Sequence, residues 1–163
     1  MQKCPFCHSK IEESVFAETL LFRAIVNIAP ILPGHVLIIP KKHIVRLIEL
    51  TDDELFEMIK FSRQIIRILE NIFKTDAFDW TIQEKEEAGQ SIPHLHLHII
   101  PRLKGDLPEP GAWFTLLKNN DHEILDSDKR QKLTNEELVR IVNILRKIYK
   151  IDLIIEPRKD FDV

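Results

Sequence analysis

Apolar residues along the chain fall into short runs that proline and glycine separate, and in several runs they alternate with polar residues. Residues 15–26 are rich in β-branched and aromatic side chains and predict one or two strands. Residues 35–39, which follow Pro33-Gly34, and residues 78–84 predict two more. A further strand is predicted between Pro93 and Pro101, where histidine alternates with leucine and isoleucine.

Two longer segments show the spacing of an amphipathic helix instead. Thr51 with Glu54 forms a capping-box pattern at the start of residues 50–74, and Thr134 with Glu137 forms a second such box ahead of the next segment. The apolar stripes expected to be buried are Leu55, Ile59, Ser62, Ile66, Leu69 and Phe73 in the first helix, and Leu138, Ile141, Leu145 and Ile148 in the second. Strands joined by hairpins, with one long helix among them, predict an α+β fold around an antiparallel sheet.

Length and composition indicate one globular unit. A chain of 163 residues with 44% hydrophobic content suits a single domain, which we expect over residues 1–150, followed by a charged C-terminal tail over 151–163. Its apolar runs are broken well short of the roughly 18 residues that span a membrane. Because the N-terminus also lacks a signal-peptide core, we expect a cytoplasmic protein without membrane contact. The net charge of −3 disfavours duplex nucleic acid as a partner.

The histidine row is the strongest chemical signal. His94, His96 and His98 stand two residues apart, so in an extended strand they share one face while the aliphatic residues between them share the other. The outer two would lie about 13 Å apart at roughly 3.3 Å per residue, whereas a zinc–imidazole bond is about 2 Å long. One ion held by all three therefore needs a bulge, although an adjacent pair could hold a metal. The row could also be only the polar surface of a half-exposed strand.

The chain has two cysteines, Cys4 and Cys7, at a spacing that is typical of zinc sites. A catalytic dithiol normally sits between a strand and a helix, which the first residues do not provide, and a structural disulfide is disfavoured in a reducing compartment. Zinc is therefore the favoured interpretation, and it requires two further ligands. On composition, the histidines that could supply them are His8, His35, His43, His94 and His122.

The segments AGQSIPHLHLHIIPR and VNIAPILPGHVLIIPKKH resemble the histidine triad (HIT) family of nucleotide-binding hydrolases and transferases. The resemblance covers residues 4–103. The prolines around the triad are similar to the branch of fragile-histidine dinucleoside polyphosphate hydrolases, more than to that of the nucleoside phosphoramidases, and CPFC with PKKH is similar to zinc-carrying members. The resemblance implies a meander with a five-stranded antiparallel sheet, one long helix and a C-terminal helix, and a homodimer formed partly through the long helix.

The resemblance also implies a catalytic role for three histidines. His96 matches the nucleophile that attacks the α-phosphorus of a nucleotide, giving a covalent nucleotidyl-histidine that water then hydrolyses. A neutral imidazole is a competent nucleophile near pH 7, which makes this chemistry reasonable. His98 would donate to a phosphate oxygen or to the leaving group, and His35 would support the cluster from a neighbouring strand.

Further positions match substrate-binding residues of the family. Asn27 matches the residue that holds the ribose hydroxyls, and residues 89–92 match the loop around the phosphates. Several of these residues also suit an ordinary turn or core position, Asn27 before a proline-rich turn among them. The substrate-binding set that the resemblance implies is Phe6, Ile25, Asn27, Leu37, Gln83, Gly89, Gln90, Ser91 and Ile92.

For the metal, the zinc-carrying relatives imply a structural zinc on Cys4, Cys7, His43 and His94, which leaves His96 for catalysis. Magnesium commonly accompanies polyphosphates, and Arg102 and Lys104 are candidates to meet the phosphate charge. Residues 103–133 match no motif.

The expected partner is a purine nucleotide or a dinucleoside polyphosphate such as diadenosine tri- or tetraphosphate, and the expected activity is its hydrolysis. A related transferase or phosphorylase, a nucleoside phosphoramidase and a nucleotide-binding signalling module are the alternatives. A hydrolase that uses His96 and His98 as zinc ligands is a further one. Hydrolase and transferase share the nucleophile, so the sequence does not separate them.

Overall fold

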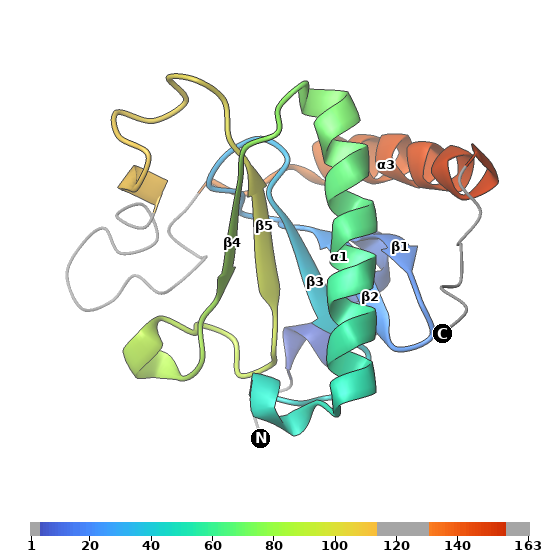
Figure 1. The fold of residues 1–163 in the computed structure, drawn as a ribbon, viewed down its shortest axis with the longest axis vertical. Helices are drawn as coiled ribbons and strands as arrows, with labels where there is room; N and C mark the ends of the chain where they lie inside the picture. Colours follow the sequence, from blue (N-terminus) through green and yellow to red (C-terminus); the bar gives the residue numbers. More distant parts are fainter. Residues whose placement is uncertain (1–3, 114–130, 156–163) are drawn as a thin grey trace.

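The fold is a five-stranded antiparallel sheet with both long helices packed against it. The computed structural model of the protein describes residues 4–113 and 131–155. In spatial order the strands are β1 (Val15–Glu18), β2 (Phe22–Val26), β3 (Val36–Pro40), β5 (Leu97–Pro101) and β4 (Phe78–Ile82). Figure 1 shows α1 (Asp52–Phe73) running across one face of the sheet, and α3 (Asn135–Ile155) packs mainly on β1. The predicted α+β architecture is confirmed.

The strands lie close to where the sequence predicts them. The region 15–26 forms two strands, because the chain turns after Glu18 and the Thr19 amide donates to the Phe22 carbonyl at 2.9 Å. The histidine strand is shorter than expected, since regular pairing in β5 begins only at Leu97. Ahead of it the Leu95 amide donates to the Ile44 carbonyl at 2.7 Å instead of to a sheet neighbour.

The predicted cap of the long helix is present. The Thr51 side chain accepts a hydrogen bond from the Glu54 amide at 3.3 Å, and the Glu54 carboxylate accepts one from the Thr51 amide at 2.8 Å. These reciprocal bonds satisfy two amide groups that a helix start otherwise leaves unpaired. Thr134 and Glu137 make the same pair of bonds at the start of α3.

The buried stripes differ in part from the predicted ones. In α1, Ile59 is 40% exposed, and the fully buried positions are Met58, Phe61, Ser62, Ile65, Ile68 and Leu69. In α3, the buried residues are Leu138, Val142, Leu145 and Tyr149, with Ile141 and Ile148 only partly buried. Apolar residues cover a wide arc of α1, so the pattern could not fix the centre of the buried face. Packing against the sheet determines which residues of α1 are buried.

The two faces of the sheet have different cores. The larger core lies between the sheet and the helices and includes the aliphatic residues between the histidines, Leu95, Leu97 and Ile99. On the opposite face a smaller cluster forms under the N-terminal arm, which comprises residues 4–13 with the short helices η1 (Pro5–Cys7) and η2 (Ser9–Glu13). The predicted alternation of the row is therefore confirmed, with aliphatic residues toward the helices and histidines away from them.

The C-terminal helix continues to Ile155, past the expected end of the domain at residue 150. Residues 156–163 of the expected tail, and residues 114–130 of the stretch without a motif, lie outside the described residues. In the described part of the chain, no helix is long and apolar enough to cross a membrane.

Candidate functional site

The histidine face of the sheet carries the candidate site. His35, His94, His96 and His98 are each at most 5% exposed, although imidazoles usually keep contact with water. The rings of His96 and His98 lie 4.8 Å apart between centroids, and those of His35 and His98 lie 5.1 Å apart. Four buried imidazoles on one face require defined hydrogen-bond partners, and these partners determine which nitrogens carry protons.

His96 is held in one tautomer by a backbone group. Its Nδ1 lies 2.7 Å from the carbonyl oxygen of His94, which can only accept, so Nδ1 carries the proton. The neutral ring then has its lone pair on Nε2. Burial lowers the pKa of His96, against a smaller opposing effect of this hydrogen bond. His96 therefore stays neutral near pH 7, as a nitrogen nucleophile must.

His98 is oriented through His35. The backbone amide of Ile31 donates to His35 Nδ1 at 3.2 Å, which places the His35 proton on Nε2. That nitrogen lies 2.9 Å from His98 Nδ1, so His98 accepts there and carries its own proton on Nε2. The Asn27 amide nitrogen lies 3.3 Å from the His35 ring, and the Asn27 side-chain oxygen accepts from the Ala29 amide at 2.9 Å. A backbone amide thus fixes the proton positions of two histidines in succession.

An apolar wall borders the histidines on the β2 and β3 side. The register pairs Ile25 with Leu37, and Leu37 with His98, so these apolar side chains continue the histidine face. Phe6 completes the wall from the N-terminal arm, with its ring edge-on to His94 and His96 at 5.6 and 5.5 Å. The full cluster is Phe6, Val15, Ile25, Leu37 and Ile39, with Cys4, Ile11 and Ile92 packed against it. Such a wall suits the planar face of a base.

The predicted phosphate loop is held by the side chain of Gln90. Its amide nitrogen donates to the Val45 carbonyl at 3.2 Å and lies 3.4 Å from the His94 carbonyl, and its oxygen accepts from the Lys85 amide at 2.9 Å. The side chain of Gln90 therefore bonds to backbone groups and fixes the shape of the loop. Gly89 has a φ of 97°, which favours glycine, and the neighbouring Ser91 is exposed.

Gln83 lies just after β4 and is buried. It shares the histidine face by strand alternation. The predicted base-binding and histidine positions are thus brought together. Among the described residues, Ser91 makes no hydrogen bond with the histidine cluster.

Cys4, Cys7, His43 and His94 form a cluster that could hold a metal ion, with all four ligand atoms within 4.8 Å of one another. His94 Nδ1 lies 3.4 Å from Cys4 Sγ and 3.5 Å from Cys7 Sγ, and His43 Nδ1 lies 3.3 Å from Cys7 Sγ. In a tetrahedral site with zinc–sulfur bonds of about 2.3 Å and zinc–nitrogen bonds of about 2.0 Å, such edges measure about 3.5 Å. The spacing fits zinc.

The protonation states in the cluster also fit a cation. His94 Nε2 lies 2.9 Å from the Pro40 carbonyl oxygen and therefore carries the proton, which leaves the Nδ1 lone pair facing the thiols. Burial lowers the pKa of His94, so the ring is neutral. Desolvation and a hydrogen bond with Cys4 raise the pKa of the Cys7 thiol, and a bound cation is what would ionise it near neutral pH.

The remaining histidine candidates lie apart from this cluster. His8 accepts a hydrogen bond from the Lys10 amide at the start of η2, and His122 lies outside the described residues. Arg102, a candidate for the phosphate charge, is engaged elsewhere. Its guanidinium donates to Asp79 at 2.6 Å, to Asp106 at 2.9 Å and to the Pro110 carbonyl at 2.7 Å, so it ties the turn after β5 to β4.

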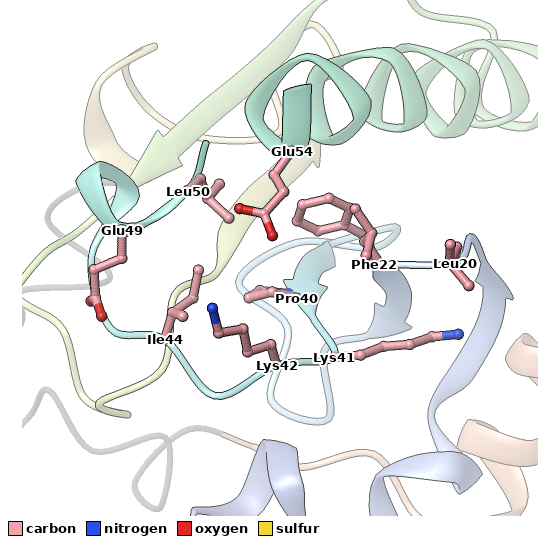
Figure 2. Close-up of a pocket in the computed structure, with 10 residues that line it drawn as sticks. Leu20, Phe22, Pro40, Lys41, Lys42, Ile44, Glu49, Leu50 and Glu54 are labelled. Carbon is pink, nitrogen blue, oxygen red and sulfur yellow. The ribbon is translucent and has the colours of Figure 1, made fainter. Parts of the chain in front are cut away.

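A separate hollow lies near the start of α1, where Figure 2 shows the side chains of Lys42 and Glu54 directed into it. None of the predicted site residues lines it. Its lining is Leu20, Leu21, Phe22, Pro40, Lys41, Lys42, Ile44, Glu49, Leu50 and Glu54. The hollow is therefore separate from the candidate site on the histidine face.

Three groups of the site were missed from the sequence: the Ile31 amide, the Pro40 carbonyl and the His94 carbonyl. All three are backbone groups that set the proton position on a histidine. Every residue except proline offers the same donor and acceptor, so residue identity carries no signal for them.

Comparison with known proteins agrees with the fold. The HIT domain model matches residues 8–105, more than half of the chain, and the chain belongs to the HIT domain family. Bis(5'-nucleosyl)-tetraphosphatase [asymmetrical] of Schizosaccharomyces pombe is 40% identical over 116 residues, which are 71% of this chain and 64% of that protein. The chain therefore spans less than two thirds of that relative's length.

Two further proteins extend the likeness over most of the chain. Bis(5'-adenosyl)-triphosphatase of Dictyostelium discoideum is 33% identical over 140 residues, which are 85% of this chain and 87% of that protein. The crystal structure of a hypothetical histidine triad nucleotide-binding protein from Sulfolobus tokodaii superposes with a TM-score of 0.70 and 27% identity, covering 92% of this chain and 94% of that one.

Proposed function

We propose that the protein hydrolyses dinucleoside polyphosphates at the α-phosphate through a covalent nucleotidyl-histidine on His96. The observation that carries this proposal is the hydrogen bond from His96 Nδ1 to the His94 carbonyl, which leaves a neutral Nε2 lone pair in a buried site. The names of the Schizosaccharomyces pombe and Dictyostelium discoideum relatives support the substrate class.

In the first step, His96 Nε2 forms a bond to the α-phosphorus while the bond from that phosphorus to the bridging oxygen breaks. The departing phosphate takes the electron pair, and His98 Nε2 donates a hydrogen bond to the bridging oxygen as charge develops there. In the second step, water attacks the phosphorus, the phosphorus–nitrogen bond breaks, His96 regains its lone pair, and the proton that the water loses passes to the solvent. Diadenosine triphosphate would yield AMP and ADP.

The surrounding residues would bind the substrate. The apolar wall of Phe6, Ile25 and Leu37 would take the base, and Asn27 at the end of β2 would hold the ribose hydroxyls. The backbone of residues 89–92 would wrap the phosphates, with Gln83 beside them. Magnesium would enter with the polyphosphate, an expectation that rests on the substrate's charge alone.

A structural zinc on Cys4, Cys7, His43 and His94 is the second part of the proposal. Two thiols and two imidazoles are a donor set that zinc prefers, and the atoms have the spacing of a tetrahedral site. The metal would supply a crosslink between the N-terminal arm and the segment ahead of β5. His94 Nδ1 faces the metal site and its Nε2 donates to the Pro40 carbonyl, so neither ring nitrogen would be available for the reaction.

A homodimer through α1 and β4 is the third part. β4 is an edge strand, so one side of its backbone has no neighbour in the sheet. Phe56 and Ile59 on α1 are 67% and 40% exposed, and Trp80 on β4 is 41% exposed. Apolar exposure next to an open strand edge is typical of a surface that a second copy covers.

The free thiols at the proposed metal site also favour the cytoplasm, a reducing compartment.

Mass spectrometry after brief mixing with diadenosine triphosphate tests the proposal. A nucleotidyl adduct on His96 in the wild type, and none in His96→Asn, is the expected result. Excess phosphate separates hydrolase from phosphorylase, because only the phosphorylase would turn the transferred AMP into ADP without incorporating solvent oxygen. Failure to trap an adduct under turnover, together with complete loss of activity on chelation, would instead favour a metal-dependent hydrolase.

A further inference from the structure

The two sides of the histidine face differ in chemistry. Toward β2 and β3 the face is apolar, as described above. Toward β4 the register places Thr81 opposite His98 and Asp79 opposite Ile100. Because alternate residues of a strand share a face, Asp79, Thr81 and Gln83 form a polar row beside the histidines. The residues between them turn the other way, and Phe78 and Ile82 pack on the core under α1.

Thr81 is the residue of this row that the register places directly opposite His98. Directly opposed residues of an antiparallel pair have Cβ atoms about 5 Å apart, which brings the Thr81 hydroxyl within reach of a ligand on His98. β5 lies between β3 and β4, so Thr81 is on the far side of His98 from His35. Thr81 is half-buried, and within the described part of the chain no hydrogen bond engages its hydroxyl.

The charge along the row suits an anion. Asp79 would repel phosphate if it were alone, but Arg102 donates to its carboxylate at 2.6 Å, and the pair is largely shielded from water. The carboxylate charge is thus balanced at the end of the row. Next to that pair the row offers a hydroxyl and an amide, both of which can donate hydrogen bonds to phosphate oxygens.

We propose that the polar row of β4 binds the departing phosphate groups of the substrate, with Thr81 donating a hydrogen bond to a phosphate oxygen beyond the bond that breaks. The inference rests on the proposed function and fixes the substrate's direction. The nucleoside of the transferred nucleotide lies over β2 and β3, the bridging oxygen lies at His98, and the leaving group lies over β4.

The test compares two substrates that share the transferred AMP and differ in the leaving group. Diadenosine triphosphate releases ADP, whereas the p-nitrophenyl ester of AMP releases a phenolate that has no phosphate. Thr81→Val keeps the shape of the side chain and a residue that favours strands, but removes the donor. It should lower kcat/KM for the triphosphate about tenfold relative to kcat/KM for the ester, the effect expected of one hydrogen bond to a charged group.

Thr81→Ser is the matched control, because it retains the hydroxyl and should restore the ratio. The melting temperature of each variant shows whether the fold is intact. An equal fall for both substrates, or no change for either, would overturn the inference. If the wild type is active and forms the His96 adduct, such a result leaves the proposed function standing. If the wild type cleaves neither substrate, the proposed function fails and this inference fails with it.

Discussion

His96 Nδ1 lies 2.7 Å from the carbonyl oxygen of His94, so the proposed nucleophile is oriented by the backbone of a proposed zinc ligand. The same carbonyl lies 3.4 Å from the Gln90 amide nitrogen. The proposed metal site, phosphate loop and nucleophile thus all contact this one backbone oxygen. A displacement of residue 94 would change the direction of the attacking lone pair, because the tautomer and the ring angle of His96 both depend on this contact.

His96→Asn should lower the hydrolysis of diadenosine triphosphate by at least about 10³-fold, since removing a nucleophile leaves only binding and electrostatic effects. Nucleotide binding, measured by calorimetry, should persist. His8→Asn is the matched control, because His8 is exposed and its ring only accepts from the Lys10 amide. A turnover in His96→Asn close to that of the wild type would contradict the covalent mechanism.

Purified protein should contain about one zinc per chain, and Cys4→Ser should lower the melting temperature by more than about 5 °C, since loss of a metal crosslink costs several kcal/mol. Turnover at a temperature where the variant is folded should fall much less, because no proposed step passes through the metal. Metal analysis with no zinc in a sample purified without chelator would rule out this part of the proposal.

His35→Ala should lower kcat about 10² fold with a small change in KM, because His98 then loses the partner that fixes its proton on Nε2. The loss should grow as the leaving group becomes more basic, since a poor leaving group depends most on proton donation. A series of aryl esters of AMP measures this dependence. An identical loss for every ester would show that His35 only supports the fold.

Trp80→Glu should convert the proposed homodimer into a monomer, because it places a charge at the edge strand in the expected interface. Light scattering with size-exclusion chromatography measures the mass. Leu20→Glu is the control: Leu20 is 84% exposed, but it lies in the β1–β2 turn and not beside β4. A wild type that is already monomeric at micromolar concentration would refute the dimer.

Asp106→Asn should destabilise the protein by about 1 kcal/mol at pH 7, a value reduced for screening by nearby water. Its hydrogen bonds with Arg102 lower the pKa of Asp106 to about 2 in the folded protein, whereas the unfolded value is near 3.8. The stabilisation is therefore complete above the unfolded pKa and is lost as pH falls through the folded one. Urea titrations should show the difference between variant and wild type shrinking from pH 4 to pH 2.

The sequence predicts the sheet, both helix caps and the alternation of the histidine row, because each depends on residue type at a fixed spacing. It does not predict the start of β5 at Leu97. The Leu95 amide donates to the carbonyl of Ile44, which precedes α1 in the chain, and not to a neighbouring strand. Nor does it locate the buried face of α1. Met58 and Ile59 are both apolar, and only the position of the sheet decides which is covered.

The role of Arg102 was also beyond the sequence. An arginine directly after the histidine strand suggests a phosphate ligand. The acceptors of the Arg102 guanidinium instead lie on β4 and in the segment after β5. Thr81 had a detectable signal, because it stands two residues from Gln83 in a predicted strand. Its relevance depends on the register with His98, which only the pairing of β4 with β5 establishes.

Cys4 Sγ lies 3.4 Å from His94 Nδ1 although 90 positions separate them in the chain. Closing so long a loop is entropically unfavourable until the strands between have assembled. The complete ligand set can therefore exist only after the chain has been synthesised through His94 and the sheet has folded. A newly made chain would acquire its metal late in folding. The metal content of a preparation would then report the fraction of molecules in which the N-terminal arm is docked on the sheet.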